Sequence, residues 1–269
     1  MTCASRLRPV ASLSAALLVV LALAGCATVG SPAAGRDPLE PMNRAVDRFN
    51  DALDRAVLKP VAQGYQDFVP EELRNVVGNV FGNVADAWTA VNQLLQGKPV
   101  EAASDLARFV LNSTLGIAGL ADVATPAGLE KHHEDFGQTL GRWGVPAGPY
   151  LVLPLLGPST LRDAPARIVD GKGDLVLAID SAGQRNNALL MRTVDERAGL
   201  LRAERVVAGA ALDRYAFIRD GYLQRRRNQV YDGNPPPSPD DEPAYDPADD
   251  PEAPAAPPSA PPSAPRPAQ

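Results

Sequence analysis

Apolar side chains recur every three or four residues along most of the sequence between residues 37 and 229, which is the spacing of one face of an α-helix. The first such stretch opens with Asp37 as a candidate N-cap, Pro38 in the first turn and Glu40 three residues after the cap. Its apolar stripe consists of Leu39, Met42, Val46, Phe49, Leu53 and Val57. The pattern stops near Lys59 and Pro60, where we expect this helix to end.

The same period predicts further helices. One runs over residues 70–97, with a break expected around Gly82 and Asn83, because glycine weakens helices. The next covers 98–116, and residues 185–228 read as two helices separated near 207–209. No strand alternation is visible beyond residues 174–179, and no internal repeat is present. The fold class is therefore predicted to be all-α.

Residues 116–160 differ because they are rich in glycine and proline. We expect short helices around 121–125 and 134–143, and another from residue 159 or 160 through 168. Between them, residues 145–158 are apolar but hostile to helix, which predicts an extended loop or hairpin. Such a segment is either buried in the core or inserted into something apolar outside the protein. Its candidate residues are Val145, Pro149, Tyr150, Leu151, Leu153, Pro154 and Leu155.

The N-terminus has the features of a secretory signal, with two arginines, the apolar run 10–23 and small residues before Cys26. The run is shorter than the roughly 20 residues that a spanning helix needs. Ala24 and Gly25 before Cys26 resemble a bacterial lipobox, which implies removal of residues 1–25 and acylation of Cys26. Two or three acyl chains give a stable membrane anchor. Ala27 in place of an aspartate suggests the outer membrane, and residues 26–36 then form a lipidated linker.

The acidic charge belongs mainly to the other end of the chain. Residues 230–269 hold 14 of the 27 prolines and eight acids against one base, out of a net charge of −6 for the whole chain. We expect this tail to be disordered, because its composition cannot bury enough apolar surface. The folded part is therefore predicted to span residues 37–229. Its lack of strong basicity and the 5% aromatic content argue against a nucleic-acid binder.

Signatures of catalysis are absent from the sequence. It has no glycine-rich phosphate loop, no CxxC pair and no GxSxG motif. The adjacent histidines His132 and His133 are awkward metal ligands and are expected in a solvated loop. Glu134 and Asp135 lie at a plausible helix start, where acids are favoured in any case. No cofactor and no metal site are predicted, and a hydrolase using Asp and Glu groups is disfavoured.

Residues 185–229 carry ten arginines against five acids. A solvated helix face explains this excess, but so does contact with anionic lipid headgroups or an acidic partner. The pattern alone leaves both explanations open.

Several segments, in order and spacing over about residues 37–170, resemble the MlaA (VacJ) lipoproteins, and the lipobox fits the same family. The matching segments are Asp37-Pro-Leu-Glu-Pro-Met-Asn-Arg44, Lys59-Pro-Val-Ala62, Val69-Pro70 with Arg74-Asn75, Asn92-Gln-Leu-Leu-Gln-Gly97, Arg108-Phe-Val-Leu-Asn-Ser-Thr-Leu-Gly-Ile-Ala-Gly119, Asp122-Val-Ala124, Asp135-Phe-Gly-Gln-Thr-Leu-Gly141, Gly148-Pro-Tyr150, Leu153-Pro-Leu-Leu-Gly157 and Thr160-Leu-Arg-Asp163. The proline-rich tail is a departure that the family does not require.

The resemblance implies an α-helical, ring-shaped (donut-like), monotopic protein in the inner leaflet of the outer membrane. Members of this family remove misplaced phospholipids from the outer leaflet and pass them to a periplasmic carrier, which maintains lipid asymmetry. They associate with a trimeric porin and involve no catalysis. A structural lipoprotein that only tethers a partner is the alternative.

We expect the mechanism to be an amphipathic passage, because moving a charged headgroup through hydrocarbon is costly. Residues 145–158 then either pack in the core or form a hairpin that inserts into the membrane or gates the passage. Asn43, Phe49 and Asn50 on the first helix are candidates for setting the closed state, although plain core packing accounts for their spacing equally well.

Overall fold

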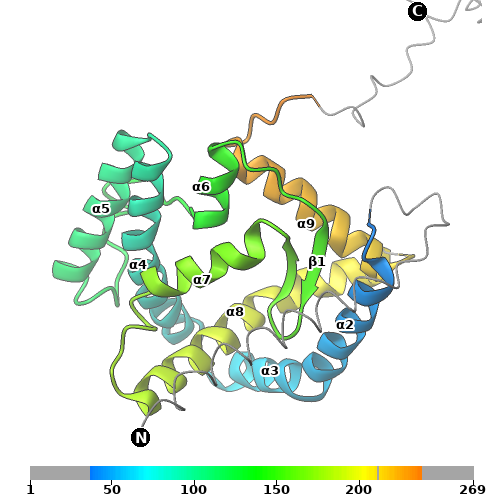
Figure 1. Cartoon of the computed structure of the whole chain (residues 1–269). Coiled ribbons are helices and arrows are strands. Elements are labelled where there is room, and N and C mark those ends of the chain that lie inside the picture. The colour runs from blue at the N-terminus through cyan, green and yellow to red at the C-terminus, as the bar shows by residue number, and fades with distance from the viewer. Residues whose placement is uncertain (1–36, 211, 238–269) are drawn as a thin grey trace, which may run out of the picture.

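The computed structural model describes residues 37–210 and 212–237, which are mostly helical (Figure 1). The predicted signal segment, the acylation site Cys26 and most of the proline-rich tail lie outside the described residues. The predicted all-α class is confirmed except for one small β-hairpin. In the described part of the chain, every helix is too short or too polar to cross a bilayer.

The first helical stretch is longer than its apolar pattern predicts. It consists of α2 (Glu40–Leu53), a π-helical turn (Asp54–Leu58) and α3 (Lys59–Phe68). The expected end near Lys59 and Pro60 is therefore wrong. Pro60 falls in the first turn of α3, directly after the π turn, so the helical stretch continues through this proline.

A helical hairpin follows, made of α4 (Glu71–Leu95) and α5 (Pro99–Thr114). α4 is continuous, so the break expected around Gly82 and Asn83 does not occur. A Cβ at residue 82 would lie 3.1 Å from Nζ of Lys131, which donates a hydrogen bond to the Gly82 carbonyl at 3.0 Å. Asn83 is buried and donates to Oγ of Ser113 on α5, so contacts with other elements hold this part of α4 in place.

The predicted helix around 121–125 is wrong, because these residues form turns. The side chain of Asn112 accepts hydrogen bonds from the backbone N–H groups of Val123 and Ala124, and Asp122 accepts from that of Thr125. Side chains thus replace helical backbone partners. The helix expected over 134–143 is confirmed as α6 (Phe136–Arg142), which is capped by Asp135.

The apolar segment 145–158 forms part of an antiparallel hairpin, as predicted, with strands β1 (Tyr150–Leu153) and β2 (Gly157–Thr160). Tyr150 pairs with Thr160, and Leu153 with Gly157. α7 (Asp163–Gly173) starts later than expected because residues 159 and 160 complete β2. Residues 174–179 form turns, so the one strand-like pattern outside the hairpin yields no strand.

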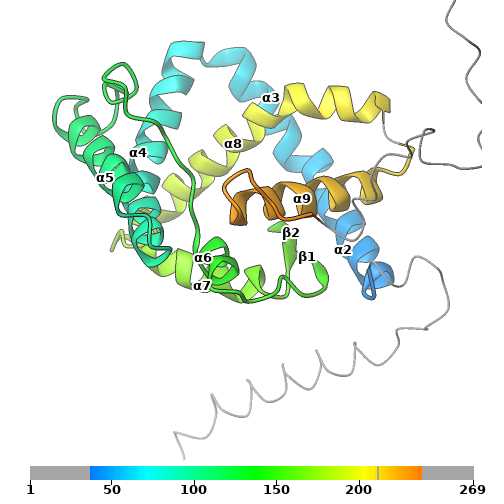
Figure 2. The ribbon, with the colours of Figure 1, turned by 90° about the horizontal axis from the view of Figure 1, so that it is seen from above.

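Two long helices complete the described chain, α8 (Ala182–Ala210) and α9 (Arg214–Val230). The expected pair of helices is confirmed, with the separation a few residues later than predicted. α8 lies along α3, and α9 lies beside α2 on the side of the molecule opposite α4 and α5 (Figures 1 and 2). α6, α7 and the β-hairpin lie between these two sides (Figure 1).

Among the described residues, buried apolar side chains form two small clusters. One joins α3 to α8 through Ala62, Ala198 and Leu201, with Tyr65 against them. The other joins β1 to α9 and contains Tyr150, Val152 and Tyr215, with Val46, Tyr222 and Leu223 packed on it. The remaining buried positions are mostly polar, and this directs attention to the interior.

Candidate functional site

The α4–α5 hairpin is inverted relative to a helix pair of a water-soluble protein. Asn92 and Gln93 of α4 are fully buried, whereas the adjacent Leu94 is 61% exposed. On α5, Asp105 and Arg108 are buried, whereas Leu106 is 52% exposed. Large apolar side chains normally occupy buried positions and charges the surface. Here the polar stripe of each helix faces inward.

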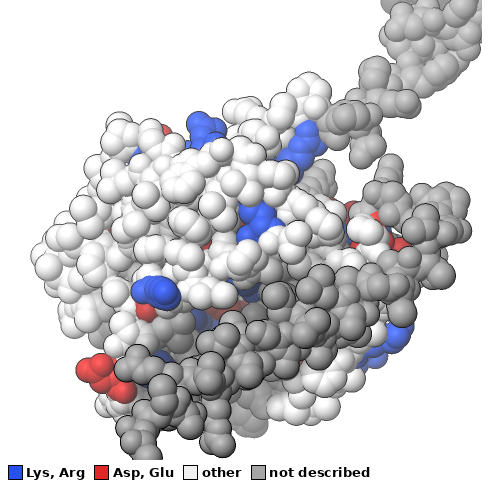
Figure 3. Space-filling model, viewed as in Figure 1, with Lys and Arg blue, Asp and Glu red and all other residues white. Residues whose placement is uncertain are grey.

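Exposed apolar side chains continue over other elements. They include Phe49, Leu53, Phe68, Leu73, Val100, Val110, Leu115, Ile117, Trp143, Leu155, Leu156, Leu161 and Ile168. Where described atoms form the surface in Figure 3, charged side chains are few and scattered. An apolar surface of this extent marks a site of contact with another apolar phase or molecule.

A charged cluster fills the interior between α4, α5 and the loop that follows α5. The guanidinium of Arg108, 1% exposed, lies 3.5 Å from Oδ2 of Asp86 and 3.2 Å from Oδ2 of Asp122, and Nζ of Lys131 lies 2.5 Å from Oδ1 of Asp86. Burial raises the pKa of Asp86, although Lys131 and Arg108 oppose this. Burial would also raise the pKa of Asp122, but hydrogen bonds from Thr125 and the charge of Arg108 hold it well below its usual range.

The two histidines have different surroundings. Nδ1 of His132 lies 2.9 Å from Oδ2 of the buried Asp105, so the predicted solvated loop is wrong for this residue. His133 is exposed at the rim of the cavity described next. Within residues 37–210 and 212–237, no three His, Cys, Asp or Glu side chains are grouped to hold a metal ion.

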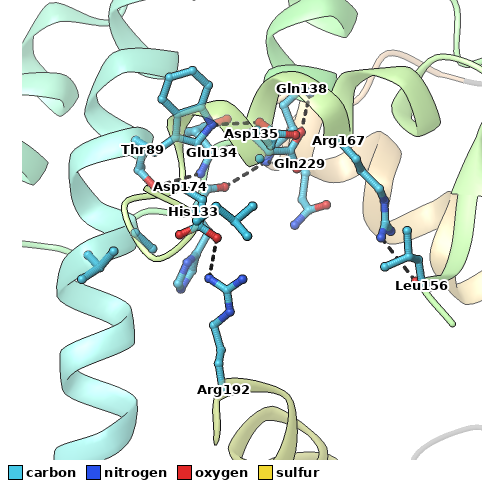
Figure 4. A pocket seen from close by; sticks show the side chains of 16 residues that line it. Thr89, His133, Glu134, Asp135, Gln138, Leu156, Arg167, Asp174, Arg192 and Gln229 are labelled. Carbon is cyan, nitrogen blue, oxygen red and sulfur yellow. Dashed lines mark hydrogen bonds and ion pairs between the residues drawn. The ribbon is translucent and has the colours of Figure 1, made fainter. Parts of the chain in front are cut away.

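A cavity of about 470 Å³ opens between α4, α6, α7 and α8 (Figure 4). The wall combines apolar side chains with paired charges. Arg192 lies 2.7 Å from Oδ2 of Asp174, and the indole N–H of Trp88 donates to Oδ1 of Asp170 at 2.8 Å. Burial raises the pKa of Asp170. The remaining polar lining residues include Thr89, His133, Glu134, Asp135, Gln138, Arg167 and Gln229.

An adjoining cavity of about 300 Å³ shares Trp88, Asp135, Arg167, Asp170 and Gln229 with the first. Its inner wall is an ion-pair network around Arg226 of α9. This guanidinium contacts both carboxylate oxygens of Asp135 at 2.6 Å and Oδ2 of Asp163 at 2.9 Å. Burial would raise the pKa of both acids, but the hydrogen bonds from Arg226 lower it below the usual value.

Glycine on α6 permits this close approach of α9. A Cβ at Gly137 would lie 2.4 Å from Nη2 of Arg226, and one at Gly141 would lie 2.8 Å from Val230. Gly137 and Gly141 are four residues apart and therefore occupy one face of α6. Any larger residue at Gly137 would push Arg226 away from Asp135.

Arg167 of α7 lines both cavities and has different partners from the other arginines. Its Nη1 donates to the carbonyl of Leu156 at 3.3 Å and its Nη2 to that of Pro158 at 3.0 Å. Figure 4 shows the side chain extending from α7 toward Leu156. Within the part of the chain that the structure describes, no carboxylate forms an ion pair with Arg167. The turn of the hairpin is thus held from inside by a cation.

Two of the three candidates on the first helix meet the hairpin from the other side. Asn43, fully buried, donates to the carbonyl of Tyr150 at 2.9 Å and accepts from the N–H of Val152 at 2.9 Å. Asn50 donates to the carbonyl of Leu153 at 3.0 Å and accepts from the N–H of Leu155 at 2.8 Å. Phe49 points outward and is 55% exposed, so it does not join this contact.

The spacing of the two asparagines fits the strand that they hold. Seven residues along a helix rise about 10.5 Å, and three residues along a strand about 10 Å. The side-chain amides of Asn43 and Asn50 therefore reach backbone groups three residues apart in the hairpin. We call this arrangement, Asn43 and Asn50 bonded to residues 150–155, the asparagine clamp.

The hairpin candidates divide between its base and its turn. Tyr150 is buried beside Tyr215 and Tyr222, with ring centroids 6.2 Å and 6.1 Å away, whereas Leu151 and Leu153 are partly buried. Pro154 and Leu155 at the turn are exposed, as is Val145 before the hairpin, and Pro149 is partly buried. The base thus packs in the core and the turn presents apolar side chains outward.

Some important residues could not be identified from the sequence. Asp37, predicted as an N-cap, is instead buried and accepts hydrogen bonds from Asn43 and from the hydroxyl of Tyr215, while α2 begins at Glu40. The arginine excess over residues 185–229 pointed to α9 but did not distinguish Arg226 from its neighbours. Nothing in the pattern indicated Asp163 or Arg167, because isolated charges on a short helix usually face water.

Comparison with known proteins places these features in a family. A model of the MlaA lipoprotein family matches residues 35–229. The "Intermembrane phospholipid transport system lipoprotein MlaA" of Escherichia coli (strain K12) is 37% identical over 218 residues, covering 79% of this chain and 86% of that protein. The lipoprotein of the same name from Haemophilus influenzae is 30% identical over 241 residues, covering 81% and 90%.

A solved structure also matches. It is described as the structural basis for maintenance of bacterial outer membrane lipid asymmetry. It superposes with a TM-score of 0.64 at 33% sequence identity, covering 74% of this chain and 99% of that chain. Family model, relatives and fold agree: this chain belongs to the MlaA lipoprotein family.

Proposed function

We propose that this protein is an outer-membrane lipoprotein that moves phospholipids toward a periplasmic carrier and thereby maintains the lipid asymmetry of the outer membrane. Its relatives are named as lipoproteins of intermembrane phospholipid transport. The chain is a transport lipoprotein and not an enzyme. The observation that carries the proposal is the inverted α4–α5 hairpin, with polar side chains inside and apolar side chains outside.

The exposed apolar side chains favour a position within the membrane. Each large side chain moved from water into hydrocarbon contributes about 1.5–3 kcal/mol. More than a dozen such side chains lie on the surface. A protein can rest in one leaflet in this way without any helix that crosses the bilayer. Acylated Cys26 would add a second anchor on the same membrane.

The polar interior provides a route for a headgroup. In our proposal, helices arranged as a ring enclose the two cavities, which are lined by Trp88, Asp135, Arg167 and Gln229 among others. A headgroup would then pass along paired charges and hydrogen-bonding side chains while the acyl tails stay near the apolar surface. This avoids the cost of placing a charged group in hydrocarbon.

The hairpin is proposed as the gate of this route. Its base is fixed in the core by Tyr150, and its turn is held by the asparagine clamp on one side and Arg167 on the other. All of these bonds to the turn are side chain to backbone, so the turn can be released without breaking either strand of the hairpin. Phe49, next to the clamp and facing outward, would rest in lipid.

A trimeric porin and a periplasmic phospholipid carrier are the proposed partners. Exposed apolar side chains lie on each helix from α2 to α5, and this surface would contact both lipid and the wall of a porin. The carrier would collect lipid at the side of the molecule where α3 and α8 carry ion pairs, such as that of Lys59 with Glu204.

A deletion strain tests the transport function. Loss of the protein is expected to raise the fraction of phosphatidylethanolamine that a membrane-impermeant amine reagent labels from outside. The wild-type gene should restore the low value, and Leu106→Glu, which places a charge on the apolar face of α5, should restore it poorly. Gln63→Glu, at an exposed position on α3, is the matched control and should restore it fully. Normal asymmetry in the deletion strain would instead favour a tethering lipoprotein.

A further inference from the structure

Arg167 combines two properties that bear on how the passage is controlled. It lines both interior cavities, and the described chain gives it only neutral acceptors, the carbonyls of Leu156 and Pro158. An arginine in a partly buried site normally pairs with a carboxylate or a phosphate, because two parallel charge-assisted hydrogen bonds are about twice as strong as neutral ones. Arg167 therefore lacks an anionic partner.

The acids around the cavities are already engaged. Arg226 holds Asp135 and Asp163, and Arg192 holds Asp174. Glu134 accepts from Lys98 at 3.2 Å, and Asp170 accepts from Trp88 and from the backbone N–H of Phe136. Each negative charge in the wall thus has its own donor, so the wall does not supply the anion that Arg167 lacks.

A second cation stands near the same space. Arg225 of α9 lines the smaller cavity together with Arg167, Gln229 and Tyr222, and it is exposed. The structure shows no ion pair for Arg225 with any described residue. The hydroxyl of Tyr222 already donates to Oδ2 of Asp163 at 3.2 Å. Two guanidinium groups from different helices, with the amide of Gln229 beside them, form a set of donors that suits the oxygens of a phosphate.

We infer that Arg167 binds the phosphate of a phospholipid headgroup inside the cavity and, in doing so, releases the turn of the hairpin. This inference rests on the proposed function, since it assigns a ligand group and a trigger to the proposed passage. The phosphate and the carbonyls of Leu156 and Pro158 compete for one guanidinium. Because the phosphate is charged and the carbonyls are not, the arriving headgroup wins this competition. The asparagine clamp then remains as the only side-chain hold that we have identified on the turn.

The competition makes the gate respond to its cargo. While the cavity is empty, Arg167 and the asparagine clamp hold the turn from opposite sides. When a headgroup enters, Arg167 gives up its hydrogen bonds to the turn, and the equilibrium of the hairpin shifts toward the released state. A ligand can move such an equilibrium only by binding one state better than the other, and Arg167 supplies that difference.

The test uses the full-length lipoprotein in a detergent that contains no phosphate, with spin labels on Phe49→Cys and Leu155→Cys. Both side chains are exposed, one on α2 and one at the turn. Added dihexanoylphosphatidylethanolamine is expected to lengthen the distance between the labels. Dihexanoylglycerol, which lacks the phosphate, should leave the distance unchanged. An equal change with inorganic phosphate at the same concentration would overturn the lipid as the ligand, and a response to dihexanoylglycerol would overturn the phosphate as the trigger.

Variants separate this inference from a general loss of structure. Arg167→Gln should abolish the lipid-dependent change and weaken binding of the short-chain lipid about ten- to hundredfold, as loss of hydrogen bonds to a charged group predicts. Arg167→Lys keeps the charge but not the paired geometry, and should retain part of the response. Arg185→Gln is the matched control, because Arg185 also donates to a carbonyl, that of Ile179, but lies outside the cavity wall.

The outcomes distinguish the two proposals. If Arg167→Gln binds the lipid as well as the unsubstituted protein and its hairpin still responds, the role of Arg167 is overturned while the transport function stands. If the unsubstituted protein itself binds no phospholipid, the proposed passage fails.

Discussion

The α4–α5 and α3–α8 helix pairs bury opposite kinds of side chain where the two helices meet. Between α3 and α8 the contact is apolar, through Ala62, Ala198 and Leu201, while ion pairs such as Arg197 with Asp54 lie at the periphery. Between α4 and α5 the contact is polar and charged, and leucine and valine side chains point outward. The two pairs thus differ in what they bury: apolar side chains between α3 and α8, and polar and charged side chains between α4 and α5.

The difference shows where the chain can meet each solvent. A buried charge is tolerated only when its partners and hydrogen bonds are complete, whereas an exposed ion pair contributes little. The interior of α4–α5 is therefore the costly part of the fold, and its outer surface the part that needs a membrane. The comparison predicts that equivalent substitutions have different effects in the two pairs.

The largest expected effect comes from the buried charge. Arg108→Ala should lower the free energy of unfolding by about 3–5 kcal/mol, because it leaves Asp86 and Asp122 without this cation in the interior. Arg197→Ala in the α3–α8 pair, whose partners are partly exposed, should cost about 1 kcal/mol. Urea titration of both variants in micelles measures the difference. Equal losses would remove the distinction between the two pairs.

Apolar truncation should show the reverse order. Leu201→Ala removes a buried side chain from the α3–α8 contact and should destabilise the protein by about 2 kcal/mol, the lower end for leucine in a small core. Leu106→Ala on the outside of α5 should change stability in micelles by less than about 0.5 kcal/mol. The same leucine should matter for flotation with lipid vesicles. A large stability loss for Leu106→Ala would indicate that this face packs against protein.

The asparagine clamp should give a local effect. Asn43→Ala leaves the carbonyl of Tyr150 and the N–H of Val152 without their partner, at a cost of about 1–3 kcal/mol. Hydrogen exchange should then accelerate at residues 150–155 and stay unchanged in α3 and α8. Phe49→Ala is the control on the same helix, because this side chain is outside the clamp. Acceleration spread evenly over the molecule would argue against a separable hairpin.

The smallest expected effect is a difference in the sign of the pH dependence. Burial raises the pKa of Asp86, so its contribution to stability falls as pH rises through its ordinary value toward the raised one. Burial would also raise the pKa of Glu204, but Lys59 and Arg197 lower it, so its contribution is lost as pH falls below about 4. Solvent screening reduces the Glu204 effect, because that side chain is 36% exposed.

Melting temperatures between about pH 3 and 6 check these signs. The melting temperature of Asp86→Asn should rise more steeply with pH than that of the unsubstituted protein. The melting temperature of Glu204→Gln should rise less steeply. Slopes that shift in the same direction for both variants would contradict the assignment.

Periodicity predicted most of the helices but not the direction in which they face. The stripe of Met42, Phe49, Leu53 and Val57 was correct as a helical pattern, yet these side chains are exposed. A period of 3.6 reports that two faces differ and does not say which one meets solvent. The lipobox at Cys26 indicated an attachment to the membrane, and the family resemblance placed the helices in it, which gives the reason for the outward orientation.

The candidate site was predicted in part. Asn43 and Asn50 were identified on one helix and Tyr150, Leu153 and Leu155 on the hairpin, and the structure joins these two groups. The joining depends on contacts more than one hundred residues apart in sequence, which local pattern cannot report. The same limit explains why Arg226 and its two acids, and the continuity of α4 past Gly82, were not predicted.

The clamp has a further consequence for solubility and aggregation. A two-stranded hairpin is barely stable alone, and its open edge invites another strand from a neighbouring molecule. α2 lends carboxamide groups to part of that edge of β1, so a helix stands in for a third strand. The edge of β1 is thereby covered by side-chain hydrogen bonds instead of a third strand. A third strand would hold the hairpin in place, whereas side-chain hydrogen bonds let it move. If the turn moves away from α2, the backbone groups that Asn43 and Asn50 bond become free to pair with another molecule. Because α2 belongs to the same chain, its asparagines can bond these groups again before a second molecule does.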